Sequence, residues 1–444
     1  MDAVEQLIAD FQERPLPTVS PRLTTLPDAS TMARVVIGMR RSGKTYLLFQ
    51  EMRRLVAAGV DRGSILYVNF EDDRLQPLAP GMLDKTLETF YRLNPGARTE
   101  GAYLFLDEIQ AVAGWSRFAR RVLDTESVRL YVSGSSAKML STEVATEFRG
   151  RGYAVELLPF SFAEALLYAG EELPTSVPGS RSRSRLEAAF TNYVRVGGFP
   201  DVQALAEDER IQTLQNYVQL VLLRDIIDRH EVRNVHAVRA FALSLLQSSG
   251  SLTSVHKVAN DLKSRGIAVG KDTLYALLDH FTDAFLLFTV PIFNRSLRVR
   301  EANPKKVYAV DPGLAFAVAH AGASNLGARL ENAVYLELRR GLHGTRGGVI
   351  SYYSTQAGHE VDFIVGDPET GHATQLVQVC ADLARVDTRQ REVRALEAAM
   401  DEVGLCEGTI VTMYDAEDLA VAGGVIHVVP AWSWMLGMHS KGNA

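Results

Sequence analysis

The stretch "GMRRSGKT", residues 38–45, decides the fold of the first part of this chain. It fits the pattern G-x-x-x-x-G-K-[S/T], follows the apolar run "RVVIG" (34–38) and precedes the helical pattern of "TYLLFQEMRRLVAAG" (45–59). A glycine-rich turn between a strand and a helix lets backbone N–H groups and the helix N-terminus point at a phosphate group. The sequence therefore predicts a phosphate-binding loop at the edge of a sheet.

The loop and the residues around it predict ATP and Mg²⁺ as ligands. Lys44 would place a positive charge beside the terminal phosphates and assist catalysis, and Thr45 would offer its hydroxyl to Mg²⁺. The residues expected to bind the nucleotide are Gly38, Met39, Arg40, Arg41, Ser42, Gly43, Lys44, Thr45, Tyr46, Asp107 and Ser135.

Two adjacent acids follow an apolar strand pattern in "YLFLDEIQ" (103–110). Asp107 is expected to hold the magnesium ion together with Thr45, and Glu108 to activate the attacking water. The alternative is that the two acids merely end a strand. We prefer the catalytic interpretation because the loop at 38–45 independently predicts such a pair.

Further polar residues come next in the chain. "YVSGSSAKML" (131–140) places Ser133, Ser135 and Ser136 where one serine would sense the terminal phosphate. "FRGRG" (148–152) supplies Arg149 and Arg151, either of which could reach the nucleotide of a neighbouring subunit as a catalytic arginine finger. Surface arginines or an internal salt bridge are the alternative for this pair.

The order of strand and helix patterns along the chain predicts an α/β fold. Short apolar strands alternate with amphipathic helical stretches, as in a parallel sheet covered on both faces. The expected strands of this sheet are 34–38, 65–70, 103–108 and 129–134.

Length and composition bound the class of protein. A chain of 444 residues with a formal charge of −6 and 47% hydrophobic residues is expected to form two to four globular domains, with no overall basic excess for nucleic acid. The acidic start "MDAVEQLIADFQERP" (1–15) does not resemble a signal peptide, and no apolar run is long enough for a membrane span. Two cysteines, Cys380 and Cys406, predict no disulfide and suit a cytoplasmic location.

A helix-turn-helix pattern occupies the middle of the chain. Residues 251–290 contain two helical segments separated at Gly266 and followed by a strand, as in a winged helix-turn-helix. A basic segment follows, and it is expected to contact DNA phosphates through Arg295, Arg298, Arg300, Lys305 and Lys306. Packing between domains is the alternative role of such a winged helix.

From about Met32 to Val429 the chain resembles a prokaryotic family of AAA-type P-loop ATPases with a winged-helix region and a C-terminal domain of unknown function. The resemblance is carried by "GMRRSGKTYLL", "YVNFED", "LFLDEIQ", "SGSS", "LPFSFAEAL", "VGGFPDV", "KVYAVDPGL", "LENAVYLEL" and "EVDFIV". The expected divisions are an N-terminal segment (1–31), a P-loop ATPase domain (32–165), a helical and winged-helix domain (166–304) and a restriction-endonuclease-like α/β domain (305–444).

The resemblance implies a nuclease-like site in the C-terminal domain, at Glu331, Asp362, Gln378 and Cys380. "EVDFIVGDPETGHATQLVQVC" (360–380) is expected to form a hairpin, with Asp362 on one strand and Gln378 and Cys380 on one face of the next. Gln378 stands where a carboxylate is usual, and Cys380 where a lysine is usual. No lysine occurs between Lys306 and Lys441. We therefore expect a site without nuclease activity, unless an arginine such as Arg385 replaces the lysine.

The resemblance also implies nucleotide-dependent action by a homo-oligomer, on or near DNA. We prefer an ATPase that remodels or moves on DNA. The alternative is a nucleotide-dependent switch or scaffold that holds a partner protein or promoter.

Overall fold

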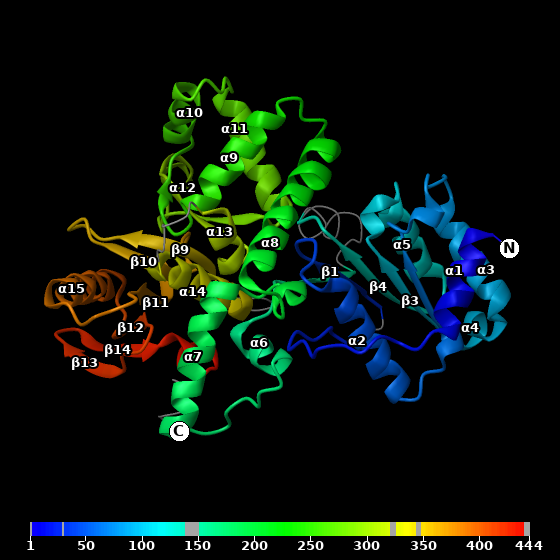
Figure 1. The fold of residues 1–444 in the computed structure, drawn as a ribbon, viewed down its shortest axis with the longest axis horizontal. Coiled ribbons are helices and arrows are strands. Elements are labelled where there is room, and N and C mark those ends of the chain that lie inside the picture. Colours follow the sequence, from blue (N-terminus) through cyan, green and yellow to red (C-terminus); the bar gives the residue numbers. More distant parts are fainter. Residues whose placement is uncertain (1, 29–30, 138–150, 320–325, 343–347, 439–444) are drawn as a thin grey trace. The chain divides into compact units, whose positions relative to one another are not determined.

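The structure is a computed structural model and describes residues 2–28, 31–137, 151–319, 326–342 and 348–438 (Figure 1). The chain divides into two compact units. The first consists of Met1–Leu158 with Asp283–Phe285, and the second of Pro159–Thr282 with Leu286–Ala444.

A five-stranded parallel sheet forms the centre of the first unit, in the order β2-β3-β4-β1-β5. Its strands are β1 (Ala33–Ile37), β2 (Ile65–Asn69), β3 (Ala102–Asp107), β4 (Val128–Gly134) and β5 (Gly152–Glu156). The four expected strands are confirmed, and β5 adds an edge that the sequence analysis does not predict. The predicted α/β class of this region is therefore confirmed.

In the described part of the first unit, five α-helices accompany this sheet. They are α1 (Ala3–Glu13), α2 (Lys44–Ala57), α3 (Met82–Leu93), α4 (Pro95–Glu100) and α5 (Trp115–Thr125). Helix α2 buries Leu47, Leu48 and Met52 against Phe105 and Tyr131 of the sheet. This packing fixes the first turn of α2 at the end of β1, where the glycine-rich loop joins them.

The second unit begins with helices, which confirms a helical middle region. They are α6 (Phe162–Tyr168), α7 (Ser180–Val196), α8 (Glu207–Val221), α9 (Val235–Gln247), α10 (Val255–Ser264), α11 (Lys271–Asp283), α12 (Leu297–Ala302), α13 (Pro312–Val318) and α14 (Leu326–Leu342). A π-helix, Leu222–Asp228, continues α8. A three-stranded antiparallel sheet accompanies these helices in the order β6-β8-β7, with β6 (Leu252–Thr253), β7 (Leu287–Val290) and β8 (Lys305–Ala309).

A six-stranded mixed sheet forms the C-terminal part of the second unit, in the order β13-β14-β12-β11-β10-β9 (Figure 1). Its strands are β9 (Val349–Ser354), β10 (Glu360–Asp367), β11 (His372–Val379), β12 (Glu407–Thr412), β13 (Glu417–Val421) and β14 (Gly424–Pro430). Helices α15 (Val386–Val403) and α16 (Ala431–Met435) complete it. Strands β10 and β11 are antiparallel neighbours, as the hairpin prediction requires.

The end of α7 and the start of α13 meet at a junction without room for side chains. A Cβ atom on Gly198 would lie 2.2 Å from the carbonyl oxygen of Phe160, and one on Gly313 would lie 2.1 Å from that of Val196. The buried Asp311 accepts a hydrogen bond from the N–H of Gly198 at 2.6 Å. The motifs "VGGFP" and "VDPGL" thus join two segments that are distant in the sequence.

Within the described residues, every helix is too short or too polar to cross a membrane.

Candidate nucleotide site and a buried carboxylate cluster

The glycine-rich loop and the two acids of β3 lie at the same edge of the parallel sheet. Strand β4 stands between β1 and β3, so its last residues lie between the loop and the acids. Gly43 begins α2 with φ +97°, in the left-handed region that glycine adopts at little cost. Because all strands are parallel, their carboxyl ends bring the predicted polar residues together.

Lys44 and Glu108 form an ion pair at the centre of this edge. The Lys44 Nζ atom lies 3.3 Å from Glu108 Oε1 and donates to the carbonyl oxygens of Gly38 and Met39, both at 3.2 Å. Both side chains are largely buried. Burial disfavours the ionised form of Glu108, but the Lys44 ammonium, the hydrogen bond from Gln110 and the Arg40 charge together hold the pKa of Glu108 below its usual value. Glu108 is therefore a charged carboxylate that could accept a proton.

Asp107 is held by three hydroxyl groups. Thr45 Oγ1 donates to Asp107 Oδ2 at 2.8 Å, and Tyr67 donates to the same oxygen at 3.0 Å. The other oxygen, Oδ1, accepts from Ser133. Burial and the neighbouring Glu108 charge raise the pKa of Asp107. The Thr45 hydroxyl and the Asp107 carboxylate are oxygen ligands of the kind that Mg²⁺ prefers, and their separation lets one ion and its waters contact both.

Gln110 and two serines complete the surroundings of Glu108. Gln110 Nε2 donates to Glu108 Oε2 at 2.6 Å and to Ser135 Oγ at 3.3 Å. Ser133 Oγ accepts from the Glu108 N–H at 3.0 Å. Glu108 has φ +51°, a left-handed conformation that is strained for a residue with a side chain. Gln110 is a site residue that the sequence analysis missed, although it lies two positions after the catalytic candidate.

The remaining loop residues take varied positions. Arg40 pairs with Glu71 at 2.7 Å, and Arg41 adopts φ +69°. Ser42 is fully buried, whereas the Tyr46 ring on α2 is 52% exposed. The structure brings the whole predicted loop to the Asp107 and Glu108 edge, and direct contact of each residue with a nucleotide stays a prediction.

Arg22 supports the loop from the N-terminal segment, and the sequence analysis missed it. The guanidinium is buried and donates to the carbonyl oxygen of Ser42 at 2.9 Å and to that of Leu158 at 2.6 Å. The side chain of Gln50 on α2 holds the Arg22 backbone, accepting from its N–H at 2.8 Å and donating to its carbonyl at 3.0 Å. Arg22 and Ser42 are 20 positions apart in the chain, so no local pattern predicts this contact.

Of the two arginine-finger candidates, only Arg151 is described. Arg149 lies outside the described residues. Arg151 is exposed and forms an ion pair with Asp124 of α5. This surface contact matches the salt-bridge alternative, and a role towards a neighbouring subunit stays a prediction.

In the basic segment that is expected to contact DNA, some side chains are exposed and others are paired with acidic residues of the protein. Arg295 and Arg298 are exposed and Lys305 is half-buried. Arg300 is 17% exposed and lies 3.7 Å from Glu369, in the turn between β10 and β11. The expectation for Lys306 is wrong, because its side chain is only 2% exposed and points into a cluster of acids instead of towards solvent.

Lys306 is surrounded by three carboxylates, two of which, Glu331 and Asp362, are predicted residues of the nuclease-like site. Its Nζ atom lies 2.7 Å from Asp362 Oδ1, 2.9 Å from Glu360 Oε1 and 3.1 Å from Glu331 Oε1. Tyr308 also donates to Glu331 Oε1, at 2.7 Å. Burial alone would lower the pKa of Lys306, but the three carboxylates raise it above its usual value. Burial and the Asp362 charge raise the pKa of Glu331 to about 8.

The structure thereby corrects the expectation that no lysine lies near the nuclease-like residues. The sequence analysis looked for a lysine only in the chain after Lys306. The lysine that contacts the acids is Lys306 itself, which lies on β8. Lys306 and Tyr308 alternate along that strand and so reach the same side of it. Lys306 occupies a position on the same face as buried residues of an apolar strand. That pattern would have indicated that the Lys306 side chain is buried. Arg385, the other candidate for this cationic role, is exposed.

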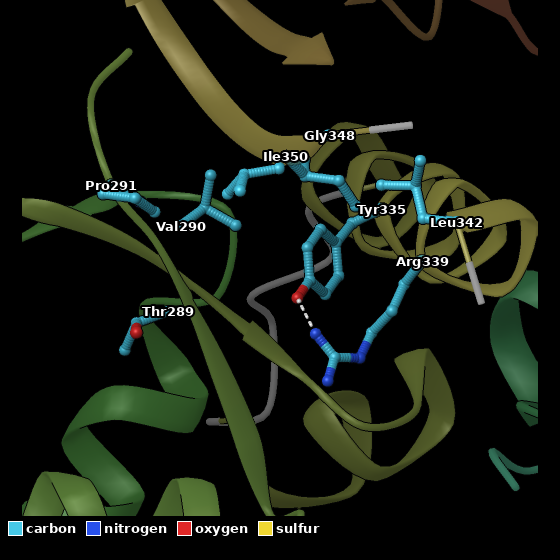
Figure 2. A pocket seen from close by; sticks show the side chains of 9 residues that line it. Thr289, Val290, Pro291, Tyr335, Arg339, Leu342, Gly348 and Ile350 are labelled. Carbon is cyan, nitrogen blue, oxygen red and sulfur yellow. Dashed lines mark hydrogen bonds between the residues drawn. The ribbon is translucent and has the colours of Figure 1, made fainter. Parts of the chain in front are cut away.

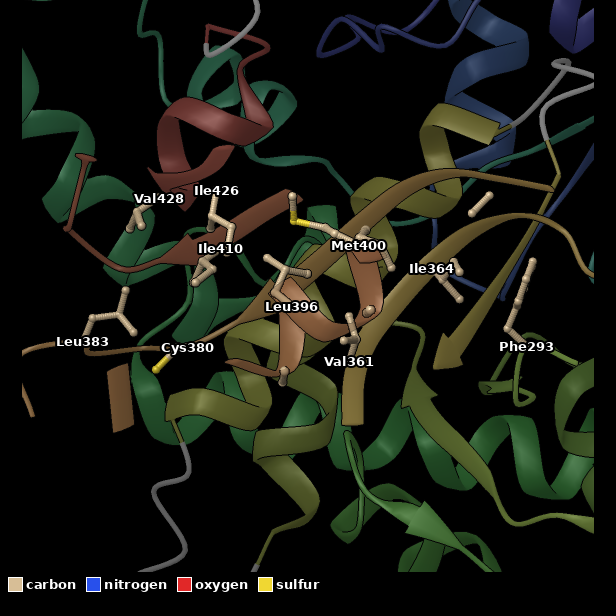
Figure 3. Close-up of a cluster of buried hydrophobic side chains, with 14 residues drawn as sticks. Phe293, Val361, Ile364, Cys380, Leu383, Leu396, Met400, Ile410, Ile426 and Val428 are labelled. Atoms are coloured by element: carbon tan, nitrogen blue, oxygen red, sulfur yellow. The ribbon is translucent and has the colours of Figure 1, made fainter. Parts of the chain in front are cut away.

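Gln378 and Cys380 are both engaged with protein groups. Gln378 Oε1 accepts from the Asp362 N–H at 3.1 Å, and its Nε2 donates to the buried Glu392 at 2.7 Å. Cys380 follows the end of β11 and belongs to a cluster of buried apolar side chains from the mixed sheet and α15, among them Leu383 and Leu396 (Figure 3). Burial raises the pKa of the Cys380 thiol. Cys380 is thus a packing residue.

A cavity of about 290 Å³ lies elsewhere in the second unit, between β7, α14 and β9 (Figure 2). Tyr335, Arg339 and Ile350 are among its lining residues. The Arg339 guanidinium lies 4.0 Å from the centre of the Phe288 ring and donates to the Tyr335 hydroxyl at 3.3 Å. Arg339, the one cationic residue of the described lining, is therefore in contact with two aromatic side chains of the protein.

Three family models match consecutive parts of the chain. An "AAA domain" model matches residues 30–166, and two models described as domains of unknown function, DUF8612 and DUF4143, match residues 187–325 and 326–434. AAA domains are typically nucleotide-binding, which agrees with the geometry of the Lys44 and Asp107 edge.

Two similar proteins cover most of the chain. The uncharacterized protein MJ1544 of Methanocaldococcus jannaschii is 31% identical over 91% of this chain and 88% of its own length. An uncharacterized protein of Haemophilus influenzae is 31% identical over 74% of this chain and 78% of its own length.

Among solved structures, the chain matches the Walker-type ATPase PABY2304 of Pyrococcus abyssi at 12% identity and a TM-score of 0.40, covering 68% of this chain and 99% of that chain. The ORC1 protein of Aeropyrum pernix in complex with DNA matches at 12% identity and a TM-score of 0.30, covering 65% of this chain and 86% of that chain.

Proposed function

This chain belongs to the family that includes the uncharacterized protein MJ1544 of Methanocaldococcus jannaschii, and from that membership and its own site we propose that it is a Mg²⁺-dependent AAA-type ATPase. One observation carries the proposal. The Lys44 ammonium, the Thr45 hydroxyl and the Asp107 and Glu108 carboxylates converge at the carboxyl edge of one parallel sheet. A phosphate-binding cation, a magnesium site and a base are the groups that hydrolysis of a phosphoanhydride needs.

Each side chain has a distinct role in the proposed reaction. Lys44 binds the terminal phosphates of ATP, and Glu108 accepts a proton from the water that attacks the last phosphorus atom, releasing ADP and phosphate. Thr45 and Asp107 would hold Mg²⁺, which neutralises charge on the phosphate oxygens. Gln110 orients Glu108, and Ser135, which accepts from Gln110, is the serine best placed to sense the terminal phosphate.

Arg22 should position the phosphate loop, because its guanidinium fixes the carbonyl of Ser42 two residues before Lys44. In Arg22→Met we expect the Kd for ATP to rise about 10-fold, from the loss of a charged hydrogen bond, with little change in kcat at saturating ATP. Arg22→Lys should restore part of the affinity. Arg53→Met is the matched control, because Arg53 also joins the N-terminal segment to α2 but does not contact the loop. Lower thermal stability with an unchanged Kd would assign Arg22 to folding alone.

For the partner we propose DNA, bound by a winged helix in the second unit. The order α9, β6, α10, α11, β7, β8 and the sheet order β6-β8-β7 support this assignment. The connection between β7 and β8 carries the exposed Arg295 and Arg298, and Lys305 opens β8. These three residues form the proposed DNA-contact group, which is smaller than the sequence analysis expects.

Replacing Arg295, Arg298 and Lys305 by Ala should weaken DNA binding equally for all sequences. We expect the slope of log K against log salt to flatten by about one unit for each lost phosphate contact. Fluorescence anisotropy with a labelled duplex over a salt series measures it. The matched control replaces three exposed arginines on other elements, Arg92, Arg117 and Arg394. An unchanged slope would make this segment a packing element.

A nucleotide-dependent switch is the second candidate, and one observation favours it. Arg300, in the same basic segment, contacts Glu369 in the β10–β11 turn, so the segment also packs within its own unit. The deciding experiment measures ATP hydrolysis with and without duplex, single-stranded and branched DNA. An ATPase that works on DNA is stimulated by it, whereas a switch is not. Repeating the assay over a range of protein concentrations tests the proposed homo-oligomer, because an arginine finger makes the rate per subunit rise with assembly.

A further inference from the structure

The C-terminal domain resembles nuclease-like domains in which carboxylates hold a divalent metal, and its residues do not fit such an ion. Among the described residues, no three His, Cys, Asp or Glu side chains are placed to bind a metal. The point towards which Glu331, Glu360 and Asp362 converge is taken by the Lys306 ammonium. Mg²⁺ or Ca²⁺ bound to the same oxygens at about 2.0–2.6 Å would stand beside this buried positive charge.

The Lys306 ammonium lies among the carboxylates in the position that a bound cation would take. A lysine has three N–H donors, and Lys306 has three carboxylate oxygens within 3.1 Å. Its side chain is 2% exposed, so it cannot turn to solvent without a rearrangement of β8. A charged group of this kind is retained in an interior only when it is paired, and these acids are its partners.

The other potential ligands are engaged as well. Asp362 Oδ2 accepts from the Val379 N–H at 2.9 Å, and Gln378 joins the Asp362 backbone to Glu392. The cluster is therefore held by two strands of the mixed sheet, by α14 and by β8. Its charges are balanced chiefly from within the protein.

We propose that Lys306 is the resident cation of this carboxylate cluster, and that removing its ammonium creates a site for a divalent cation with oxygen ligands. The inference concerns the second unit alone and does not depend on ATP hydrolysis.

The test is calorimetric titration of the full chain with Mn²⁺ in the absence of nucleotide. Lys306→Met should bind about one Mn²⁺ per chain more than the wild type. It should also show a higher melting temperature with Mn²⁺ than without, because a bound ion stabilises the folded state. Lys263→Met, altered at an exposed lysine of α10 in the same unit, should behave as the wild type. The added Asp362→Asn change should abolish the extra binding of Lys306→Met.

Two results would overturn the proposal. One is a folded Lys306→Met chain that binds no more Mn²⁺ than the wild type. The other is Mn²⁺ binding by the wild type, or Mg²⁺- or Mn²⁺-dependent nicking of supercoiled DNA, that Asp362→Asn removes. The wild-type arm decides the question even if Lys306→Met does not fold, because a wild-type chain with a resident ammonium should bind no ion at Asp362.

Discussion

Glu108→Gln is expected to bind ATP about as tightly as the wild type and to hydrolyse it about 10²- to 10⁴-fold more slowly. The amide can keep the contacts with Gln110 and Lys44 but cannot accept the proton of the attacking water. Affinity and turnover should therefore separate. Titration with a fluorescent ATP analogue gives the first, and single-turnover phosphate release gives the second.

Glu88→Gln, an exposed substitution on α3, is the matched control and should leave both quantities unchanged. Unimpaired turnover in Glu108→Gln would refute the role of Glu108 as the base. Equal losses of affinity and turnover would instead indicate that the carboxylate mainly shapes the loop through its pair with Lys44.

Lys44→Met should lose both ATP affinity and hydrolysis, by about 10²-fold or more in the hydrolysis rate. The Lys44 ammonium is paired with the largely buried Glu108 carboxylate, so its removal also takes a charged partner away from that carboxylate. We therefore expect a lower melting temperature as well. The combined variant Lys44→Met with Glu108→Gln should recover part of that stability without recovering any turnover.

Lys85→Met, on the exposed surface of α3, serves as the control for loss of a lysine. Nucleotide affinity and steady-state hydrolysis are the measurements. Wild-type affinity in Lys44→Met would mean that the backbone of the loop alone binds the phosphates. A melting temperature that rises in the single variant would show that Glu108 is not destabilised by losing its partner.

The arrangement of the glycine-rich loop and the two acids at one edge of the parallel sheet could be predicted from the sequence, because its determinants are local. The glycines, Lys44 and Thr45 lie within one turn between β1 and α2, and Asp107 and Glu108 end a strand whose neighbours repeat the same apolar pattern. Parallel pairing then places these ends together without further information. The strands and the α/β class followed from the same periodicity.

Arg22 and Lys306 could not be found in that way, because their partners are distant in the chain. Arg22 contacts the carbonyl of Leu158, 136 positions later, and Lys306 contacts Asp362, 56 positions later. Such contacts depend on which sheet edges meet, which periodicity does not specify. The sequence analysis therefore named Glu331 and Asp362 but looked for a nearby lysine only in the part of the chain after Lys306.

The junction at Gly198 has a consequence for how the protein is made. The hydrogen bond from the Gly198 N–H to Asp311 cannot form until Asp311 is synthesised, 113 residues after Gly198. At ordinary rates of translation this delay is on the order of ten seconds. During that interval the apolar side of α7, including Phe190 and Val194, has left the ribosome without its later partners. The parallel sheet, by contrast, is complete once Glu156 emerges. Biosynthesis therefore completes the parallel sheet early, whereas the Gly198 junction of the second unit can form only after the "VDPGL" segment has been made.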